Sequence, residues 1–291
     1  MADENGGPSP LKEDIWSNAM YKDLTGKRIL ITGASRGIGA GIATALAACG
    51  ARLVLHYHQN DRKMAQHLEP IRQNGTEAVT LRCDFRDETA LTPFYQKAEQ
   101  AFGGLDMLVN NAGIVPKKHL LKSPTALWRE TMAINLDAPF ILSNHFAKAR
   151  RTADNPGMVL HISSIHGTVT SERFGLYAAT KAGLNRLAQA QAIEWAEWGI
   201  RVNVIAPGVT VVSRNRQRLE STRKTWQGHL PMGRYGAVED VAHLALFLLS
   251  SQSAWITGQI HTLDGGLTAR GHYPARHDAS TLDDIATDSD A

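Results

Sequence analysis

The chain alternates between short, nearly continuous apolar runs and longer segments in which apolar residues recur at helical spacing. Runs rich in Val, Ile and Leu are typical of strands buried on both faces of a parallel sheet. They predict strands at Arg28–Thr32, Arg52–Tyr57, Val79–Cys83, Met107–Val109, Met158–Ile162, Val202–Ile205 and Gln259–Leu263. The longer segments predict helices at Gly37–Ala48, Arg62–Gln73, Glu88–Phe102, Tyr177–Trp198 and Val238–Leu249. This alternation indicates an α/β fold, a doubly wound parallel sheet of about seven strands with helices on both faces.

Polar stretches rich in Gly and Pro lie at both ends of this pattern, and nothing in the middle of the chain marks a boundary. Such stretches bury too little apolar surface to fold by themselves. We therefore expect a flexible N-terminal arm over residues 1–23, one folded domain over 24–270 and a flexible tail over 271–291.

The composition narrows the class of protein. With 291 residues and 43% hydrophobic content, the chain can build a large core. A formal net charge of +3 gives no reason to expect a nucleic-acid partner, and no apolar run approaches the roughly 18 residues of a membrane helix. The first residues lack the features of a signal peptide. Cys49 and Cys83 form no CxxC pair, which favours free thiols in a reducing compartment, so we expect a soluble, cytoplasmic protein.

A glycine-rich turn follows the first predicted strand. The run TGASRGIG, residues 32–39, leads into the first predicted helix. Glycine lets the backbone turn sharply and approach a ligand closely, and a helix N-terminus offers free N–H groups with a positive dipole end. In this strand–turn–helix context the run predicts a cradle for the pyrophosphate of a dinucleotide, although glycines also mark ordinary turns.

Tyr177 and Lys181 stand four residues apart at the start of the longest predicted helix, so their side chains share one helical face. A free tyrosine has a pKa of about 10, too high for efficient proton exchange near neutral pH. A nearby ammonium stabilises the phenolate and lowers that pKa. The pair therefore predicts an acid–base site, whereas the same spacing alone is also common with a packed tyrosine and a solvated lysine.

Taken together, the TGxxxGxG turn, the YxxxK helix and the motifs below resemble the classical short-chain dehydrogenase/reductase family, over about residues 25 to 267. The resemblance implies a Rossmann-like fold and an NAD(P)(H)-dependent oxidoreductase that interconverts a carbonyl and a secondary alcohol by hydride transfer. Tyr177 would be the general acid/base, with its pKa lowered by Lys181. Ser164, thirteen residues before Tyr177, would hold the substrate carbonyl oxygen. Asn135 would hold a water that relays protons, or could instead cap or bend a helix.

The resemblance also implies which residues hold the cofactor. Asn111 to Gly113 would line the adenosine side, Asp84 would contact the adenine, and Pro207-Gly208 would pass the nicotinamide. Asp84 could equally be a turn residue or a helix cap. The full set of expected cofactor contacts is Gly33, Ser35, Arg36, Gly37, Ile38, Gly39, Tyr57, Asp84, Asn111, Ala112, Gly113, Tyr177, Lys181, Pro207 and Gly208. Residues 257–266 resemble a subunit interface of relatives, so a homotetramer or a dimer is expected.

The second predicted strand bears on the choice between NAD(H) and NADP(H). NAD-preferring relatives place an Asp where Tyr57 stands, to bond the ribose hydroxyls and repel a 2′-phosphate. Arg36, inside the glycine-rich turn, is a candidate for binding that phosphate, and Arg62 could help from the next helix. We therefore expect NADP(H) to be preferred over NAD(H), although Arg36 could also be a solvated loop charge.

Basic residues gather where the resemblance places the substrate. Five basic residues and one acid lie between Arg214 and Trp226, and Lys117-Lys118 follows the Asn-Asn-Ala-Gly segment. They favour an anionic substrate, such as a sugar acid or a 3-oxoacyl thioester, against the alternative of simply solvated charge. These two classes correspond to competing resemblances, to gluconate- and sugar-type dehydrogenases and to 3-oxoacyl-carrier-protein reductases. The expected substrate contacts are Ser164, His166, Tyr177 and Lys117.

Two other classes of function compete with a small-molecule enzyme. A dinucleotide-binding regulator of the same fold would keep the glycine-rich turn, but the presence of the Tyr, Lys, Ser and Asn described above favours catalysis. The Arg-rich segment is poor evidence for nucleic-acid binding without a recognised motif. The 12 histidines are scattered, and His56 and His58 lack a third ligand nearby, so no metal site is expected. We expect neither a nucleic-acid nor a membrane partner.

Overall fold

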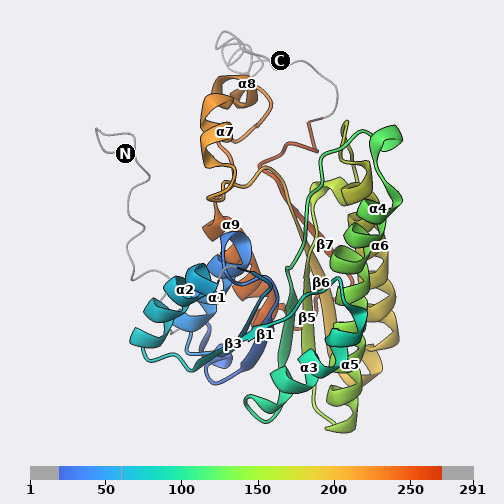
Figure 1. The fold of residues 1–291 in the computed structure, drawn as a ribbon. Helices are drawn as coiled ribbons and strands as arrows, with labels where there is room; N and C mark the ends of the chain where they lie inside the picture. The colour runs from blue at the N-terminus through green and yellow to red at the C-terminus, as the bar shows by residue number, and fades with distance from the viewer. Residues whose placement is uncertain (1–19, 60, 271–291) are drawn as a thin grey trace, which may run out of the picture.

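The computed structural model describes residues 20–59 and 61–270, and its centre is one sheet of seven parallel strands (Figure 1). The strands are β1 (Arg28–Ile31), β2 (Arg52–Tyr57), β3 (Ala78–Arg82), β4 (Met107–Asn110), β5 (Gly157–Ile162), β6 (Ile200–Pro207) and β7 (Ile260–Leu263). Their order across the sheet is β3-β2-β1-β4-β5-β6-β7, with every neighbouring pair parallel. The doubly wound parallel sheet predicted from the apolar runs is confirmed.

Helices cover both faces of the sheet (Figure 1). One face carries α1 (Gly37–Ala48), α2 (Asp61–Gln73) and α9 (Val238–Leu249). The other carries α3 (Leu91–Gln100), α4 (Thr125–Met132), α5 (Ala138–Thr152) and α6 (Gly175–Glu194). Across the described residues, no helix has both the length and the apolar character that crossing a membrane requires.

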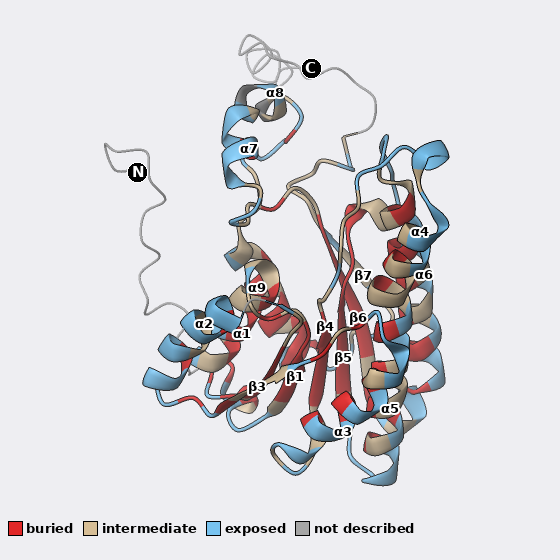
Figure 2. Cartoon of the chain, in the orientation of Figure 1, coloured by how far each residue is buried: buried red, intermediate tan, exposed pale blue. Residues whose placement is uncertain are grey.

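Alternate residues of each central strand enter two separate cores. In β1, Ile29 and Ile31 face the core under α1, α2 and α9, while Leu30 faces the core under α3, α5 and α6. All three side chains are fully buried, and β2 follows the same alternation. Figure 2 shows the strands as a buried layer between helices whose outer faces are exposed. Burial on both sides explains why the strands appear in the sequence as continuous apolar runs.

The sheet extends to both sides of β1. Strands β2 and β3 extend the sheet to one side, and β4 returns to pair with β1 on the other. Because all strands are parallel, their carboxyl ends meet along one edge, and the connections from β1 and β4 diverge there. Open α/β sheets bind ligands at such a switch point. The turns after β1 and β4 are therefore the place to look for a site.

Some elements differ from the sequence prediction. Helices α4 and α5 occupy the stretch between β4 and β5, where no element is predicted, and a π-helical turn, Ala133–Asp137, joins them. The helix predicted over 177–198 begins at Gly175 and ends at Glu194. A 3₁₀ turn follows, and Gly199 ends it with a φ of 68°, a left-handed conformation that redirects the chain into β6.

The folded part of the chain includes residues just before residue 24, the predicted start of the domain. Tyr21 is buried against the core, and Lys22–Leu24 form a 3₁₀ turn. The Asp23 carboxylate accepts the Ser251 N–H at 2.6 Å, which ties this start to the far end of α9. The rest of the expected N-terminal arm, and the expected tail over 271–291, lie outside the described residues.

Between β6 and α9, residues 211–235 form an outlying layer that we call the lid segment (Figures 1 and 2). It contains two short helices, α7 (Arg216–Ser221) and α8 (Arg223–Gln227). Its ends are joined at their base: the Val211 N–H donates to the Gly236 carbonyl at 2.8 Å, and the Gly236 N–H donates to the Val209 carbonyl at 3.0 Å. The lid segment is thus a loop closed where it leaves the sheet.

Candidate active site

A cleft of about 590 Å³ opens at the carboxyl ends of β1, β2, β4 and β5. This volume is typical of sites for small molecules and cofactors. The sequence-predicted residues that line it are Gly33, Ser35, Arg36, Gly37, Ile38, Tyr57, Asp84, Asn111, Ala112, Gly113, Tyr177 and Lys181. The glycine-rich turn and the Tyr177 helix therefore face one cleft.

Three predicted cofactor contacts are not among the described residues that line this cleft. Gly39 lies inside α1, where a Cβ would collide with the Asn111 side chain. A Cβ at Gly208 would lie 2.8 Å from the Cα of Asp264, so the Pro207-Gly208 turn packs against the chain after β7. Val212, Ser213 and Arg214 of the lid segment line the cleft beyond this turn.

Two glycines give the turn after β1 its shape. Gly33 and Gly37 have φ values of 67° and 59°, a region that strains other residues. A Cβ at Gly33 would lie 2.9 Å from the Cα of Ala112, so the turns after β1 and β4 approach each other as bare backbone. Asn111 locks them together, because its Nδ2 donates to the Thr32 carbonyl at 2.8 Å and to the Gly33 carbonyl at 3.1 Å.

The first turn of α1 fits an anionic group. Its N-cap residue, Arg36, makes no side-chain hydrogen bond to the helix, and no acidic residue stands in the first turn. The leading N–H groups of a helix have no partner within the helix and carry the positive end of its dipole. Because Gly37 and Ile38 line the cleft, these donors are available to a pyrophosphate.

His56 supports the glycine-rich turn from β2. Its Nδ1 accepts the Gly33 N–H at 3.1 Å, and its Nε2 donates to the Cys83 carbonyl at 3.1 Å. Its ring stacks on Phe85 at a centroid distance of 4.0 Å. A ring that accepts at one nitrogen and donates at the other is neutral, and burial lowers the pKa of His56 to about 4. Within the described chain, no three His, Cys, Asp or Glu side chains gather as a metal would require.

Tyr177 lies in the first turn of α6 and is hydrogen-bonded to Ser164, which follows β5. The Ser164 Oγ accepts the His166 N–H at 3.2 Å, which fixes its position. Burial raises the pKa of Tyr177, while the Ser164 hydrogen bond and the charge of Arg214 lower it. The net direction is upward, opposite to the sequence prediction, because burial outweighs the other two effects. In this structure Tyr177 is a neutral phenol with a proton to give.

Lys181 is buried one helical turn beyond Tyr177. Its Nζ donates to the Ile162 carbonyl at 2.8 Å and lies 5.7 Å from the centre of the Tyr177 ring. Burial lowers the pKa of Lys181 to about 8, so its ammonium is still charged at neutral pH. The structure therefore places a positive charge next to the phenol, held by the backbone of β5.

Asn135 sits in the π-helical turn between α4 and α5 and is fully buried. Its Oδ1 accepts the Ile114 N–H at 2.9 Å, and its Nδ2 donates to the Ile114 carbonyl at 2.9 Å and to the Thr180 hydroxyl at 3.2 Å. A Cβ at Gly113 would lie 3.2 Å from this Oδ1 and 3.9 Å from Lys181 Nζ. Asn135 thus clamps the strand end after β4 against α6, beside Lys181.

The cleft end at β2 and β3 carries several charges. Arg86 binds the Asp84 carboxylate through two nitrogens, with the closest contact at 2.6 Å, and His58 lies 3.3 Å from it. The Arg86 hydrogen bond is the largest cause that lowers the pKa of Asp84, to about 2. Lys63, from α2, lines this end with Arg36 and Tyr57. Arg62, the residue expected there from sequence, is not among the described lining residues.

Aromatic rings form a wall next to Tyr177. The His166 ring lies 5.9 Å from the Tyr177 ring, edge to face, and stacks on Phe174 at 4.4 Å. The Lys117 ammonium lies 4.8 Å from the centre of the Phe174 ring. Burial lowers the pKa of His166, and its Nδ1 is buried with no hydrogen-bond partner among the residues that the structure describes. The predicted substrate contacts His166 and Lys117 are therefore brought to the same side of Tyr177.

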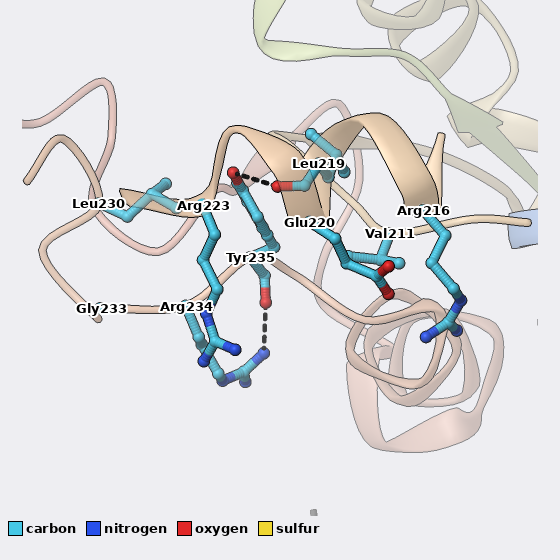
Figure 3. A pocket seen from close by; sticks show the side chains of 9 residues that line it. All are labelled: Val211, Arg216, Leu219, Glu220, Arg223, Leu230, Gly233, Arg234 and Tyr235. Carbon is cyan, nitrogen blue, oxygen red and sulfur yellow. Dashed lines mark hydrogen bonds between the residues drawn. The ribbon is translucent and has the colours of Figure 1, made fainter. Parts of the chain in front are cut away.

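A second, smaller cavity of about 220 Å³ lies under α7 (Figure 3). Leu219 and Leu230 are buried beside it, and the Tyr235 hydroxyl donates to the Leu219 carbonyl at 3.2 Å. Arg216 and Arg223 line its rim. The Tyr235 hydrogen bond holds α7 against the base of the lid segment, and none of the described residues that line this cavity lines the cleft that contains Tyr177.

Sequence reasoning does not single out several residues of this site. Lys63 has a usable signal, because it stands in the first turn of the helix that follows β2. Phe174 and Arg173 have none: their importance depends on how the loop before α6 folds. Nothing in the sequence distinguishes Arg214 from the other arginines of the lid segment, but in the structure it lines the cleft.

Comparison with known proteins gives consistent matches over most of the chain. Residues 33–268 match the protein family described as enoyl-(acyl carrier protein) reductase. The chain is 34% identical to 3beta-hydroxysteroid dehydrogenase 1 of Eggerthella lenta over 257 residues, which cover 86% of this chain and 96% of that protein.

Solved structures match equally well. A short-chain type dehydrogenase/reductase of Mycobacterium marinum superimposes with a TM-score of 0.80 and 30% identity, over 87% of this chain and 99% of that one. A 3-oxoacyl (acyl-carrier-protein) reductase of Agrobacterium tumefaciens, with NADP bound, gives a TM-score of 0.77 and 31% identity, over 83% of this chain and 94% of that one. These similarities span both the glycine-rich turn and the Tyr177 helix.

Proposed function

The chain belongs to the classical short-chain dehydrogenase/reductase family and is an NAD(P)-dependent oxidoreductase acting on CH–OH groups, and we propose that Tyr177 is its general acid and base. The observation that carries the proposal is the half-buried phenol of Tyr177, hydrogen-bonded to Ser164 and close to the charged Lys181. A proton donor, an oxygen-binding hydroxyl and a cation in one place are what reduction of a carbonyl needs.

In the proposed reaction, the hydroxyls of Ser164 and Tyr177 hold the substrate carbonyl oxygen. When bound, the nicotinamide cofactor supplies the hydride that adds to the carbonyl carbon. Tyr177 gives its proton to the oxygen, and the positive charge of Lys181 stabilises the phenolate that remains. In the direction of alcohol oxidation, the phenolate takes the hydroxyl proton back. Asn135 holds the strand end after β4 against Thr180 of α6, and its proposed part in proton relay works through a water at that position.

NADP(H) is the preferred cofactor in this proposal. The first turn of α1 and the glycines around it fit a pyrophosphate, and the cleft continues to Arg36 and Lys63, which offer two cations for a 2′-phosphate. No acid stands at the end of β2, where Tyr57 is placed. The nearby Asp61 is hydrogen-bonded to Tyr57 and is not among the described residues that line the cleft. The solved 3-oxoacyl reductase with NADP bound is consistent with this choice.

An anionic substrate, a sugar acid or a 3-oxoacyl thioester, is the substrate class of this proposal. It is supported by Lys117 beside the aromatic wall and by Arg214 in the cleft. The two relatives named above with defined activities are a hydroxysteroid dehydrogenase and a 3-oxoacyl reductase, so the class of substrate has to come from this chain's own residues.

Assembly as a homotetramer or dimer, in the cytoplasm, completes the proposal. Large apolar side chains are exposed on α4, α5 and α6, namely Trp128, Phe140 and Ile193, and Trp255 is 99% exposed. Solvent-facing apolar surface of this kind favours burial between subunits. Cys49 and Cys83 are both free and buried, consistent with a reducing compartment. Sedimentation velocity at several concentrations would test the assembly.

Fluorescence titration with NADPH and with NADH, followed by turnover on ketones, sugar acids and acyl thioesters, tests the proposed function. We expect tighter binding of NADPH and reduction of at least one substrate class. Binding without turnover of any carbonyl or alcohol would point to a dinucleotide-binding regulator instead. Binding of neither cofactor would contradict the assignment of the cleft.

A further inference from the structure

Four basic side chains from three segments come together at the entrance to the Tyr177 site. Lys117 lies on the loop after β4, Arg173 on the loop before α6, and Arg214 and Arg218 in the lid segment. The Lys118 N–H donates to the Arg173 carbonyl at 3.0 Å, so Lys117 and Arg173 lie on adjoining loops. Partial burial lowers the pKa of Lys117, and the charges of Arg218, Arg214 and Arg173 lower it further, so each of the three arginines lies near enough to Lys117 to act on it. We call these four residues the basic cluster.

The basic cluster makes no ion pair in the described part of the chain. None of its four members makes an ion pair with a carboxylate there, whereas Arg28, Arg52, Arg86, Arg150 and Arg234 each do. Like charges brought together without a partner raise the energy of the folded state. Such an arrangement becomes favourable when an anion binds among them.

The backbone holds the cluster in place. Arg173 has a φ of 70°, a left-handed conformation that is uncommon for a residue with a side chain. Its carbonyl accepts the Lys118 N–H at 3.0 Å, which joins the loop after β4 to the loop before α6. Strained backbone of this kind persists where the surrounding structure requires it, and it often marks a functional site. Here it fixes Lys117 and Arg173 on neighbouring loops.

The cluster is also close to the reacting groups. From Lys117, two ring contacts, Phe174 and then His166, lead to Tyr177. Arg214 lines the same cleft as Tyr177, and its charge lowers the pKa of Tyr177. A charged group bound at Arg214 would therefore lie in the same cleft as Tyr177.

We propose that the basic cluster binds the negatively charged group of a small substrate, a carboxylate or a phosphate only a few bonds from the carbon that is oxidised or reduced. This rests on the proposed function only in taking Tyr177 as the place of reaction. It selects a small hydroxy or oxo acid, or its phosphate counterpart, over a carrier-bound thioester, whose charged groups lie many bonds from its 3-oxo group. Lys117 and Arg214 contact the anion, and Arg173 and Arg218 add their charge from behind them.

Titration calorimetry of the NADP⁺-saturated protein with inorganic phosphate and with acetate tests the proposal without needing the true substrate. Saturation with NADP⁺ fills the cofactor's own phosphate sites, and low ionic strength avoids screening. We expect at least one anion to bind, and Lys117→Gln and Arg214→Gln each to weaken it at least fivefold. Lys118→Gln and Arg216→Gln remove the same charge from the neighbouring residue and from the α7 cavity, and should leave it within twofold. Equal weakening by all four variants, or no binding to the wild type, would overturn the proposal.

Which anion binds separates the two sources of charge: acetate alone indicates a carboxylate substrate, and phosphate alone a phosphate ester. Matched pairs then connect binding to reaction. Acetoacetate and acetoacetamide, and dihydroxyacetone phosphate and dihydroxyacetone, differ mainly in charge. We expect kcat/KM to favour the charged partner at least tenfold in the wild type and to lose that preference in Lys117→Gln. Turnover of the neutral partner with equal efficiency would leave the oxidoreductase intact but reject the anion site.

Discussion

The ammonium of Lys181 donates a 2.8 Å hydrogen bond to the carbonyl of Ile162, the last residue of β5. The strand that carries this carbonyl leads directly to Ser164, so one backbone segment positions both the cation and the hydroxyl proposed to bind the substrate oxygen. The same bond keeps a charged amine in a buried place, where burial lowers its pKa to about 8. Lys181 therefore lowers the stability of the fold at neutral pH, and it also places a positive charge beside Tyr177.

Lys181→Met should be more stable than the wild type at pH 7 and inactive. A pKa lowered from 10.5 to about 8 corresponds to about 3 kcal/mol, and the lost bond to Ile162 takes back about 1 kcal/mol. Above pH 8 native Lys181 releases its proton while the unfolded chain keeps its own up to about pH 10.5, so the wild type gains stability relative to the variant. Urea unfolding of both proteins between pH 7 and 10 would measure this. A difference that stays constant across that range would contradict the buried charge.

Tyr177→Phe should lose turnover by a factor of roughly 10²–10⁴, the usual contribution of a positioned acid. NADPH affinity should stay within twofold, because the ring and its packing remain. Tyr95→Phe is the matched control: Tyr95 is buried in the core, its hydroxyl has no hydrogen-bond partner among the described residues, and its removal should leave turnover unchanged. Steady-state kinetics with a fluorescence titration of NADPH would check both. Wild-type turnover in the Tyr177 variant would reject it as the acid.

The sequence predicts the sheet well and the stretch between β4 and β5 poorly. Strands buried on both faces leave continuous apolar runs, and those runs are visible without a structure. The buried positions of α4 and α5 include Thr131, Ser143 and Arg150, so their apolar stripe is weak. The π-helical turn that carries Asn135 also shifts the helical phase between them.

For the site, motif spacing finds the residues that line the cleft along the sheet edge, such as Gly33, Asn111 and Tyr177. It does not give the net direction of the Tyr177 pKa, because burial depends on packing that no local pattern reveals. It also selects Arg62 where Lys63 faces the cleft, since one residue on a helix turns a side chain by about 100°.

Arg36→Ala and Lys63→Gln should each raise the KM for NADPH about tenfold or more and leave the KM for NADH nearly unchanged. A charge-assisted hydrogen bond to a phosphate contributes about 1.5–3 kcal/mol, which corresponds to that factor. Arg62→Gln, one residue from Lys63 and outside the described cleft lining, is the control and should change neither constant. Parallel kinetics with the two cofactors would show whether the loss is specific to the phosphate. An equal rise in KM for NADPH and NADH would mean that these residues do not recognise the 2′-phosphate.

Acid should destabilise the protein between pH 6.5 and pH 4 through two buried histidines. Burial lowers the pKa of both His56 and His161 to about 4, so over this range the unfolded chain binds protons that the native state does not. Stability must therefore fall as pH falls, by about 1.4 kcal/mol per pH unit for each histidine.

His161→Asn should remove about half of the part of this slope that the two histidines contribute. The wild-type ring donates to Gln191 and accepts from Asn110, so the replacement keeps a polar group in that place. His119→Asn, at an exposed position, should leave the slope unchanged. Urea unfolding at several pH values for the three proteins would give the slopes. The same slope in His161→Asn and the wild type would show that His161 takes up its proton in the native state.

The closed base of the lid segment has a consequence for how this protein can change. Because Val211 and Gly236 are joined by backbone hydrogen bonds, the strand β6 and the helix α9 meet there regardless of what lies between them. Doubling the length of such a loop adds only about 0.6 kcal/mol of closure entropy. Residues 211–235 can therefore be exchanged between homologous chains at little cost in closure entropy, and such a graft would change the charges at the entrance together with Val212, Ser213 and Arg214, which line the cleft.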